Sequence, residues 1–555
     1  MDDPIISHSA SFHGAAAAPR IGPHSISQRE QRRVVFASSL GTIFEWYDFY
    51  LYATLTPFFS ALFFPEGNAT ANLLSAFAVY AAGFLVRPFG AIVFGRIGDL
   101  VGRKYTFLMT IVVMGASTFA VGLLPTYASI GIAAPILLVL LRLAQGLAIG
   151  GEYGGAATYV AEHVADRDRG YATSWIQTTA TLGFFLSLLV IGVCRNTFEV
   201  ETWKDWGWRI PFLLSLILLV FSVYIRIRLQ ESPVFRAMKA SGKGSKSPLR
   251  DSFLRYPNNK YVLLALLGAT AGQGVVWYTG QFYALFFLET VLKVDLNTRY
   301  TLIGLSLLIG TPFFLVFGRL SDRIGRLKII LAGCLLAAVT YIPLFHGLTH
   351  FVNPALEEYQ ARYPITVATS DYSFHVFTSK DTKYSPGDRV RDFLTKSGLP
   401  FTSLPGVPGH DVVTRIGDIE LYGWDKDPDA AKSGQFEAAL KATGYPTRAD
   451  PEQIAWIPTL MILVLMVIYV TMVYGPIAAF LVELFPTRIR YSSMSLPYHI
   501  GNGWFGGMLP LLATAMVASS GDIYFGLWYP IIVALMTVVV GGLFLRETKD
   551  RSIHD

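Results

Sequence analysis

Cysteine and charge are both scarce in this chain. It has 2 cysteines among 555 residues, Cys194 and Cys334, and both fall in or beside apolar stretches. Such cysteines form neither a disulfide framework nor a thiolate metal site, and we expect no metal and no cofactor. Only 15% of the residues are charged, whereas 52% are hydrophobic. Because this charge is too little to solvate a globular surface of that size, most of the chain is expected to face lipid.

Features of two further classes are also missing. The net charge is +6, but no basic patch interleaved with aromatic residues marks a nucleic-acid surface, so we expect no nucleic-acid partner. The first residues, Met1-Asp2-Asp3, do not form the basic region that opens a cleaved signal peptide. Residues 1–30 are therefore expected to be a disordered cytoplasmic tail.

Long apolar stretches fill most of the remaining chain. About twelve of them reach the roughly 20 residues that cross a bilayer. Basic residues collect in alternate short loops, which predicts that both termini lie in the cytoplasm. The sequence thus predicts an all-α membrane protein with twelve transmembrane helices in two pseudo-symmetric six-helix halves. The predicted units are 31–229 (first half), 230–260 (cytoplasmic linker), 261–346 and 455–546 (second half), and 547–555 (cytoplasmic tail).

One long segment, 347–454, is polar and interrupts the second half between the ninth and tenth predicted helices. Alternating residues at 365–369 and 419–422 predict strands, and the pattern near 436–443 predicts a helix. We expect a small external α/β domain with a lid, partner-binding or structural role. No nucleophile motif accompanies its histidines, so the sequence does not predict an enzyme.

A ten-residue motif occurs twice. Residues 95–104 read Gly-Arg-Ile-Gly-Asp-Leu-Val-Gly-Arg-Lys, and residues 318–327 read Gly-Arg-Leu-Ser-Asp-Arg-Ile-Gly-Arg-Leu. Each copy lies between two apolar stretches, and a duplicated bundle is the usual plan of a secondary transporter. The charges either form a cytoplasmic gate between the halves or anchor a fixed topology. The predicted gating residues are Gly95, Asp99, Gly102, Arg103, Gly318, Asp322, Arg323, Gly325 and Arg326.

Ionisable residues inside the apolar stretches are functional candidates because they are costly in a membrane. Asp48 lies about 22 Å into the first stretch, and Arg142 reaches a similar depth in the fourth. Such a pair is either a proton switch, because the arginine favours the charged carboxylate only while they touch, or a static ion pair. Glu45 and His499 complete the predicted proton-coupling set. A hydrogen-bonded structural imidazole is the alternative for His499.

Other polar and aromatic residues predict a substrate site. Arg87 suits a carboxylate by bidentate contact, unless it is the partner of Glu45 or Glu152. Aromatic residues in the seventh and tenth stretches either bind a quaternary ammonium by cation–π contact or face lipid. The predicted substrate-binding residues are Arg87, Arg142, Tyr47, Gln273, Trp277, Tyr278, Tyr474 and Asn502.

The repeated loop resembles the signature of the major facilitator superfamily, and further stretches resemble its metabolite:proton symporter family. These stretches are Phe44-Glu45-Trp46-Tyr47-Asp48-Phe49, 142–146 with 150–155, 208–212 with 231–233, and 483–491. The resemblance implies alternating access and proton-coupled uptake of compounds such as α-ketoglutarate, citrate, shikimate, proline or betaine. It also implies that Asp48 and Arg142 occupy the positions of the coupling Asp and Arg in related sugar porters. One departure is Leu100, where the family often has arginine, so this gate contact is expected to be weaker than its counterpart at Arg323.

The sequence therefore predicts a proton-coupled importer of a small organic acid in a bacterial inner membrane. Two intramembrane arginines, Arg87 and Arg142, favour an anion; a zwitterion such as proline or betaine is the alternative. A membrane sensor and an exporter are the other readings. The expected partners are a small carboxylate or zwitterion, protons and the lipid bilayer, and we expect a monomer.

Overall fold

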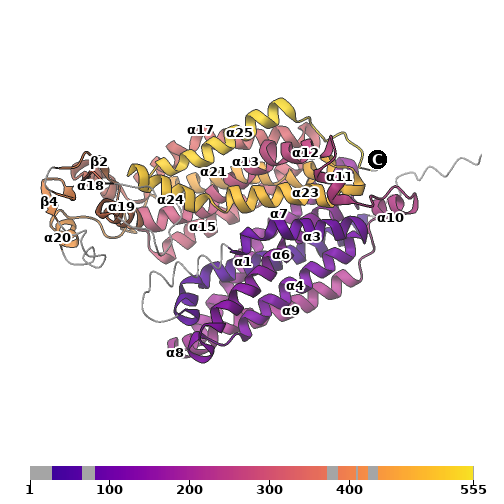
Figure 1. Cartoon of the computed structure of the whole chain (residues 1–555), viewed down its shortest axis with the longest axis horizontal. Helices are drawn as coiled ribbons and strands as arrows, with labels where there is room; N and C mark the ends of the chain where they lie inside the picture. Colours follow the sequence, from indigo (N-terminus) through magenta and orange to yellow (C-terminus); the bar gives the residue numbers. More distant parts are fainter. Residues whose placement is uncertain (1–27, 65–81, 372–384, 408–409, 423–434, 554–555) are drawn as a thin grey trace, which may run out of the picture.

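Long apolar helices form one elongated bundle (Figure 1). The structure, a computed structural model, describes residues 28–64, 82–371, 385–407, 410–422 and 435–553. Ten helices within these residues are long and apolar enough to cross a membrane, and α1 and α3 pack beside them. The count of twelve stays a prediction, because the start of the second apolar stretch lies outside the described residues. Almost all of the predicted tail 1–30 lies outside them too.

The first half of the chain forms one side of the bundle. Its long helices are α1 (Gln28–Phe63), α3 (Arg87–Leu100), α4 (Arg103–Leu123), α6 (Ala133–Ala161), α7 (Arg169–Thr197) and α9 (Ile210–Ile227). Its short elements are α5 (Tyr127–Ile130), η1 (Asp166–Asp168), α8 (Val200–Asp205) and η2 (Gly207–Arg209). The linker to the second half contains α10 (Pro233–Ala240) and α11 (Pro248–Phe253).

The second half forms the other side, and several of its helices are assembled from α and π segments. The first continuous helix consists of α12 (Asn258–Ala265), η3 (Leu266–Thr270), α13 (Ala271–Tyr278), η4 (Thr279–Tyr283), α14 (Ala284–Phe286) and η5 (Phe287–Val291). It is followed by α15 (Leu296–Gly310), α16 (Pro312–Ile324) and α17 (Arg326–Val352). After the insertion come α21 (Trp456–Tyr474), α22 (Ile477–Leu484), η6 (Thr487–Ile489), α23 (Arg490–Ile500), η7 (Gly501–Gly506), α24 (Leu509–Ser520), η8 (Phe525–Leu527) and α25 (Trp528–Phe544).

The two ends of the bundle differ. The chain's last described residues and the linker helices α10 and α11 lie at one end, here named the terminal end (Figure 1). The insertion lies at the opposite end, here named the insertion end. Residues 547–553 do not form a free tail: Ile553 is buried, and its carbonyl accepts hydrogen bonds from Thr487 and Arg490.

Glycines bring α3 and α6 unusually close. A Cβ atom at Gly90 would lie 2.0 Å from the carbonyl oxygen of Leu147, and one at Gly150 would lie 2.2 Å from that of Arg87. Small residues let helix backbones approach in this way in membranes. The close approach positions Arg87, the first residue of α3, at the middle of the bundle.

The insertion folds as a small α/β unit. Its strands are β1 (Ile365–Thr369), β2 (Thr402–Leu404), β3 (Val412–Ile416) and β4 (Ile419–Tyr422), in the sheet order β2-β1-β3-β4. β1 pairs parallel with β2 and antiparallel with β3. Three helices accompany the sheet: α18 (Pro354–Arg362), α19 (Pro386–Lys396) and α20 (Gln435–Ala442). The predicted strands at 365–369 and 419–422 and the predicted helix are present, but α17 extends past the predicted boundary at 347.

The insertion packs on the second half. A short strap, residues 397–401, reaches the ends of two bundle helices: the ammonium of Lys293, just after η5, donates to the carbonyl of Ser397. The amide of Phe401 donates to the carbonyl of Gly521, just after α24, at 2.9 Å. Burial lowers the pKa of the Lys293 ammonium. The strap therefore ties together the ends of two membrane spans, Asn258–Val291 and Thr487–Ser520, whose middle parts line the central cavity described below.

Deleting residues 354–454 and joining Asn353 to Ala455 with a short Gly-Ser linker is expected to leave the bundle intact. The ends of the insertion already meet, since the amide of Ala455 donates to the carbonyl of Phe351 at 2.8 Å. The loss of buried contacts at Ala449 and Ile454 should lower Tm in detergent by roughly 5–10 °C, at about 2–4 °C per kcal/mol. Size-exclusion chromatography and a melting curve, with the intact chain as control, test this. Aggregation of the shortened chain would contradict it.

Candidate functional site

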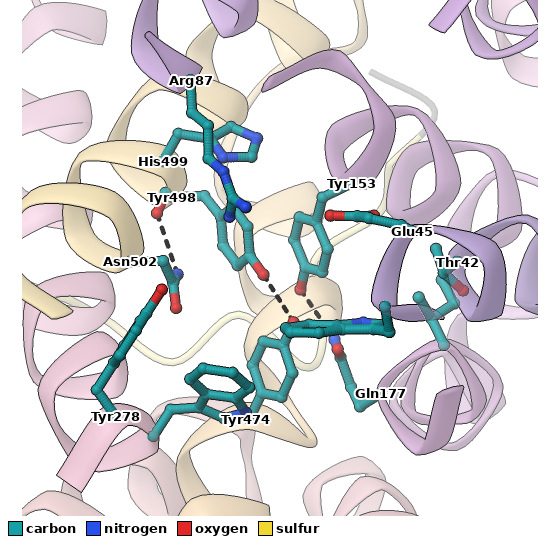
Figure 2. Close-up of a pocket in the computed structure, with 13 residues that line it drawn as sticks. Thr42, Glu45, Arg87, Tyr153, Gln177, Tyr278, Tyr474, Tyr498, His499 and Asn502 are labelled. Atoms are coloured by element: carbon teal, nitrogen blue, oxygen red, sulfur yellow. Dashed lines mark hydrogen bonds between the residues drawn. The ribbon is translucent and has the colours of Figure 1, made fainter. Parts of the chain in front are cut away.

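A cavity lies between the two halves, in the middle of the bundle (Figure 2). It contains about 460 Å³ not filled by atoms, including the part open to solvent. Side chains of both halves line it: Thr42, Glu45, Trp46, Arg87, Tyr153, Ile176, Gln177, Trp277, Tyr278, Tyr474, Tyr498, His499 and Asn502. The predicted residues Glu45, Arg87, Trp277, Tyr278, Tyr474, His499 and Asn502 are thus brought together in one place.

Two charged side chains of the cavity form no ion pair with any residue that the structure describes. No ion pair among the described residues includes Arg87 or Glu45. The Arg87 guanidinium lies 4.2 Å from the centroid of the Phe84 ring, and its Nε has no hydrogen-bond partner in the described part of the chain. Figure 2 shows Arg87 and Glu45 entering the cavity from different sides. The cavity therefore offers one cation and one anion to a ligand.

Other polar side chains of the wall differ in how many hydrogen bonds they make. The indole nitrogen of Trp277 has no hydrogen-bond partner among the described residues, so it is free to donate. The ring of His499 lies by the backbone of Gly150, and neither nitrogen makes a hydrogen bond of standard geometry with a described residue. Asn502 exchanges hydrogen bonds of 2.8 and 3.0 Å with Gln273, which stands behind the wall.

Aromatic rings from the two halves meet on the insertion-end side of the cavity. Trp46 packs on Trp277 with ring centroids 5.1 Å apart. One turn further along α1, Phe49 and Tyr50 both contact the ring of Phe282, with centroids 5.5 and 6.1 Å away. This layer closes the cavity toward the insertion end.

Three tyrosines form a second junction between the halves. The rings of Tyr153 and Tyr498 stack with centroids 3.6 Å apart and planes within 3°. The hydroxyl of Tyr498 is 2.7 Å from that of Tyr474, and Gln177 donates to the Tyr153 hydroxyl at 2.9 Å. The sequence reasoning missed Trp46, Tyr153, Gln177 and Tyr498 as wall residues, although the first two lie inside stretches that carried the family resemblance.

Asp48 and Arg142 meet, as their depths predicted. Arg142 Nη1 lies 3.4 Å from Asp48 Oδ2, and Gln145 donates to the other carboxylate oxygen at 3.1 Å. Gln145 also accepts from Arg142 at 2.6 Å and donates to Thr118 at 3.0 Å. Asp48 is fully buried inside the first half. The geometry fits both a switch and a static pair.

Three predicted substrate residues do not line the cavity. Arg142 turns toward Asp48 and the ring of Tyr52, 4.0 Å from its centroid. Tyr47 is buried in the first half, where its hydroxyl donates to the carbonyl of Pro211 at 2.6 Å. Gln273 contacts the wall only through Asn502. Counting along a helix gives the depth of a side chain but not the direction in which it points, which is why these assignments failed.

At the terminal end, each copy of the repeated motif caps a helix of the opposite half. Asp99 accepts hydrogen bonds from the backbone amides of Tyr491 and Ser492, which begin α23, at 3.2 and 2.9 Å. Asp322 accepts from the amides of Gly170 and Tyr171, which begin α7, both at 2.8 Å. A carboxylate at a helix N-terminus is stabilised by the amide donors and the helix dipole. These contacts join the halves crosswise.

The arginines of the motif extend this junction. Arg103 donates to Asp99 at 2.8 Å and to the carbonyl of Thr487 in the other half at 2.7 Å. Arg326 pairs with Asp322 at 2.9 Å and with Glu483 at 3.0 Å. Four further buried charges were missed by the sequence reasoning: Arg490 binds Glu162 at 2.7 Å, and Arg169 binds Glu483 at 2.8 Å. We call this cluster of contacts the terminal-end lock; it consists of Asp99, Arg103, Glu162, Arg169, Asp322, Arg326, Glu483 and Arg490.

The glycines of the repeated motif are needed for two different reasons, a positive φ angle at some positions and close helix packing at others. Gly102 and Gly325 have φ angles of 154° and 119°, and a Cβ on either would lie within 2.4 Å of a glutamate, Glu231 or Glu547. These glutamates accept from the amides that begin α4 and α17, for example Arg103 N at 3.2 Å and Arg326 N at 2.7 Å. Gly95 packs on the backbone of Ser492, and Gly318 on Ser174 and the carbonyl of Gly170.

Arg323 does not take part in the lock. Its side chain is exposed and pairs with no carboxylate among the described residues, and its carbonyl accepts a hydrogen bond from Lys549 at 3.0 Å. Leu100, its counterpart, is also exposed. The expected weakening of the gate at Leu100 is therefore wrong, because neither position faces the other half.

Comparisons with known proteins agree with this architecture. The Major Facilitator Superfamily description matches residues 38–352, and the description "Sugar (and other) transporter" matches residues 438–555. The α-ketoglutarate permease of Escherichia coli is 35% identical over 334 residues, which cover 59% of this chain and 75% of the permease. The proline/betaine transporter of Escherichia coli is 36% identical over 327 residues, which cover 58% of this chain and 65% of that protein.

A solved structure shares the fold. The proton:xylose symporter XylE superposes with a TM-score of 0.64 at 14% identity, covering 95% of this chain and 98% of that chain. Two helical halves around a central cavity, together with these matches, define a multi-pass membrane transporter. The chain belongs to the major facilitator superfamily.

Proposed function

We propose that this transporter is a proton-coupled symporter that imports a small carboxylate-bearing solute, and that a zwitterion suits its cavity best. The observation that carries the proposal is the pair of unpartnered opposite charges, Arg87 and Glu45, on the wall of one cavity. A guanidinium suits a carboxylate, and aromatic rings suit a quaternary or secondary ammonium. Arg142, which favoured an anion in the sequence, is neutralised by Asp48 and turned away from the cavity.

Two lines of similarity support this proposal. A relative of this chain is named a proline/betaine transporter, and both solutes are zwitterions. A second candidate is a dicarboxylate, since another relative is named an α-ketoglutarate permease and the wall that carries Arg87 also carries the indole N–H of Trp277, which has no hydrogen-bond partner among the described residues. We further propose that the terminal end faces the cytoplasm of a bacterium, in accord with the basic loops.

Uptake into proteoliposomes tests the function. Labelled proline, glycine betaine, α-ketoglutarate, citrate and shikimate are supplied with and without an inward proton gradient. We expect gradient-driven accumulation of one compound, abolished by a protonophore. Binding without net flux would support a sensor instead, and flux only in the opposite direction would support an exporter.

The terminal-end lock is expected to be the inner gate. Replacing Glu483 by glutamine leaves Arg169 and Arg326 with weaker partners, and breaking a buried ion pair costs about 3–5 kcal/mol. We expect the halves to separate there, so that a cysteine at Ser174, buried at the junction, reacts several-fold faster with a maleimide. The background is Cys194→Ser/Cys334→Ser. Glu201→Gln, an exposed carboxylate outside the lock, is the matched control, and equal labelling rates in both variants would refute the gate.

A further inference from the structure

The first half holds three carboxylates at membrane depth, and they differ in their partners. Asp48 is paired with Arg142 and Gln145. Glu152 is paired with Arg226 and accepts a hydrogen bond from the Thr110 hydroxyl at 2.7 Å. Arg226 also donates to the carbonyl of Phe107. Glu45 forms no ion pair within the described part of the chain, and it alone of the three lines the cavity.

The charges around Glu45 leave one cation unbalanced. Glu152 and Arg226 face it from α6 and α9, Asp48 from its own helix, and Arg87 from α3. The other titratable side chains of the cavity wall are Tyr153, Tyr278, Tyr474, Tyr498 and His499. Glu152 and Asp48 have their own arginines and do not line the cavity, so among these described groups Arg87 is the charge near Glu45 that a bound ligand can neutralise.

We propose that Glu45 takes up the cotransported proton, and that a substrate carboxylate bound to Arg87 is what makes it do so. This inference rests on the proposed function. In the empty cavity the positive charge of Arg87 favours the ionised form of Glu45. A bound carboxylate cancels that charge, while the ammonium of a zwitterion is held by the aromatic rings of the wall rather than by Glu45. The buried Glu45 carboxylate is then left without compensation, and such a group is stabilised by taking a proton. Proton and substrate then bind cooperatively, each raising the affinity for the other by the same factor.

Asp48 is poorly placed for this role. It has no exposed surface and does not line the cavity, and its two oxygens accept from Arg142 and Gln145. A proton reaching it must first pass the cavity wall and then displace these donors. Glu45 lies three residues earlier on α1, on the turn that faces the cavity.

Substrate-induced proton uptake by the purified protein tests the proposal. Glycine betaine, proline or α-ketoglutarate is added to the protein in weakly buffered detergent with a pH dye, and binding is measured by calorimetry. We expect the native protein to take up a proton on binding, approaching one per bound molecule as the pH is raised to values at which Glu45 of the empty cavity is ionised. We expect Glu45→Gln to bind without proton uptake and to exchange substrate at a rate that no longer depends on pH. Glu201→Gln is the control, and proton uptake by Glu45→Gln equal to that of the native protein would overturn the proposal.

A measurement on the native protein covers the case in which Glu45→Gln does not fold. One linked proton predicts that the substrate Kd rises up to about tenfold per pH unit in the range where Glu45 loses its proton. A Kd that is constant between pH 5 and pH 9 would overturn the proposal while leaving a uniporter possible. A native protein that binds none of the three solutes and transports none of the wider panel would instead refute the proposed function.

Discussion

Replacing Arg87 by methionine is expected to abolish carboxylate binding at working concentrations. Truncating one partner of a buried charge-assisted contact costs about 2–5 kcal/mol, which is roughly a 30-fold to several-thousand-fold rise in Kd. Methionine keeps much of the volume beside Phe84, so the packing of α3 on α6 should survive. Calorimetry with glycine betaine and α-ketoglutarate, and counterflow exchange in proteoliposomes, measure the effect.

Arg96→Met is the matched control, because Arg96 lies on the same helix with its side chain exposed. Arg87→Lys separates charge from shape, since lysine keeps the charge but not the planar fork. We expect it to restore part of the affinity. Native affinity in Arg87→Met would show that the substrate carboxylate binds elsewhere.

Breaking the Asp48–Arg142 pair is expected to have the largest effect on stability. Asp48→Asn leaves a buried guanidinium without its counter-ion, at a cost of about 3–5 kcal/mol. The double variant Asp48→Asn/Arg142→Gln removes both charges and should recover most of the lost Tm. Melting curves in detergent for the two single variants and the double variant measure this coupling.

The same double variant separates the two readings of the pair. If the pair only pins α1 to α6, gradient-driven accumulation should return together with stability. If it is a proton switch, the double variant should be stable but unable to accumulate substrate. A double variant no more stable than the single ones would contradict the ion-pair argument altogether.

Much of the fold was accessible from the sequence because hydrophobicity and repetition are long-range signals. Apolar stretches predicted the membrane helices, the duplicated motif predicted two related halves, and alternation predicted β1 and β4 in the insertion. Depth along a helix, at a fixed rise per residue, brought Asp48 and Arg142 together correctly. These inferences need only the period and length of regular structure.

The remaining parts of the site depend on orientation and on distant pairing. Arg142 and Tyr47 are at suitable depths, yet they point into the first half rather than the cavity. Many partners in the lock are far apart in the sequence, by 328 residues for Arg490 and Glu162 and by 157 for Arg326 and Glu483, so no local pattern connects them. The stacked pair Tyr153 and Tyr498 is likewise created by the meeting of the two halves.

The strap at residues 397–401 fixes the insertion to the second half, so the insertion is expected to move with that half as one body. The strap contacts two helices of the second half. A small rotation of that half is therefore expected to displace the far side of the sheet by a larger distance than it displaces the helices themselves. A dye at exposed Tyr422 of β4 and another at exposed Lys204 of α8, both introduced as cysteines, would report that rotation as a change in energy transfer. The energy transfer between the two dyes would then follow the transport cycle of a single molecule in real time, with both dyes placed away from the binding cavity.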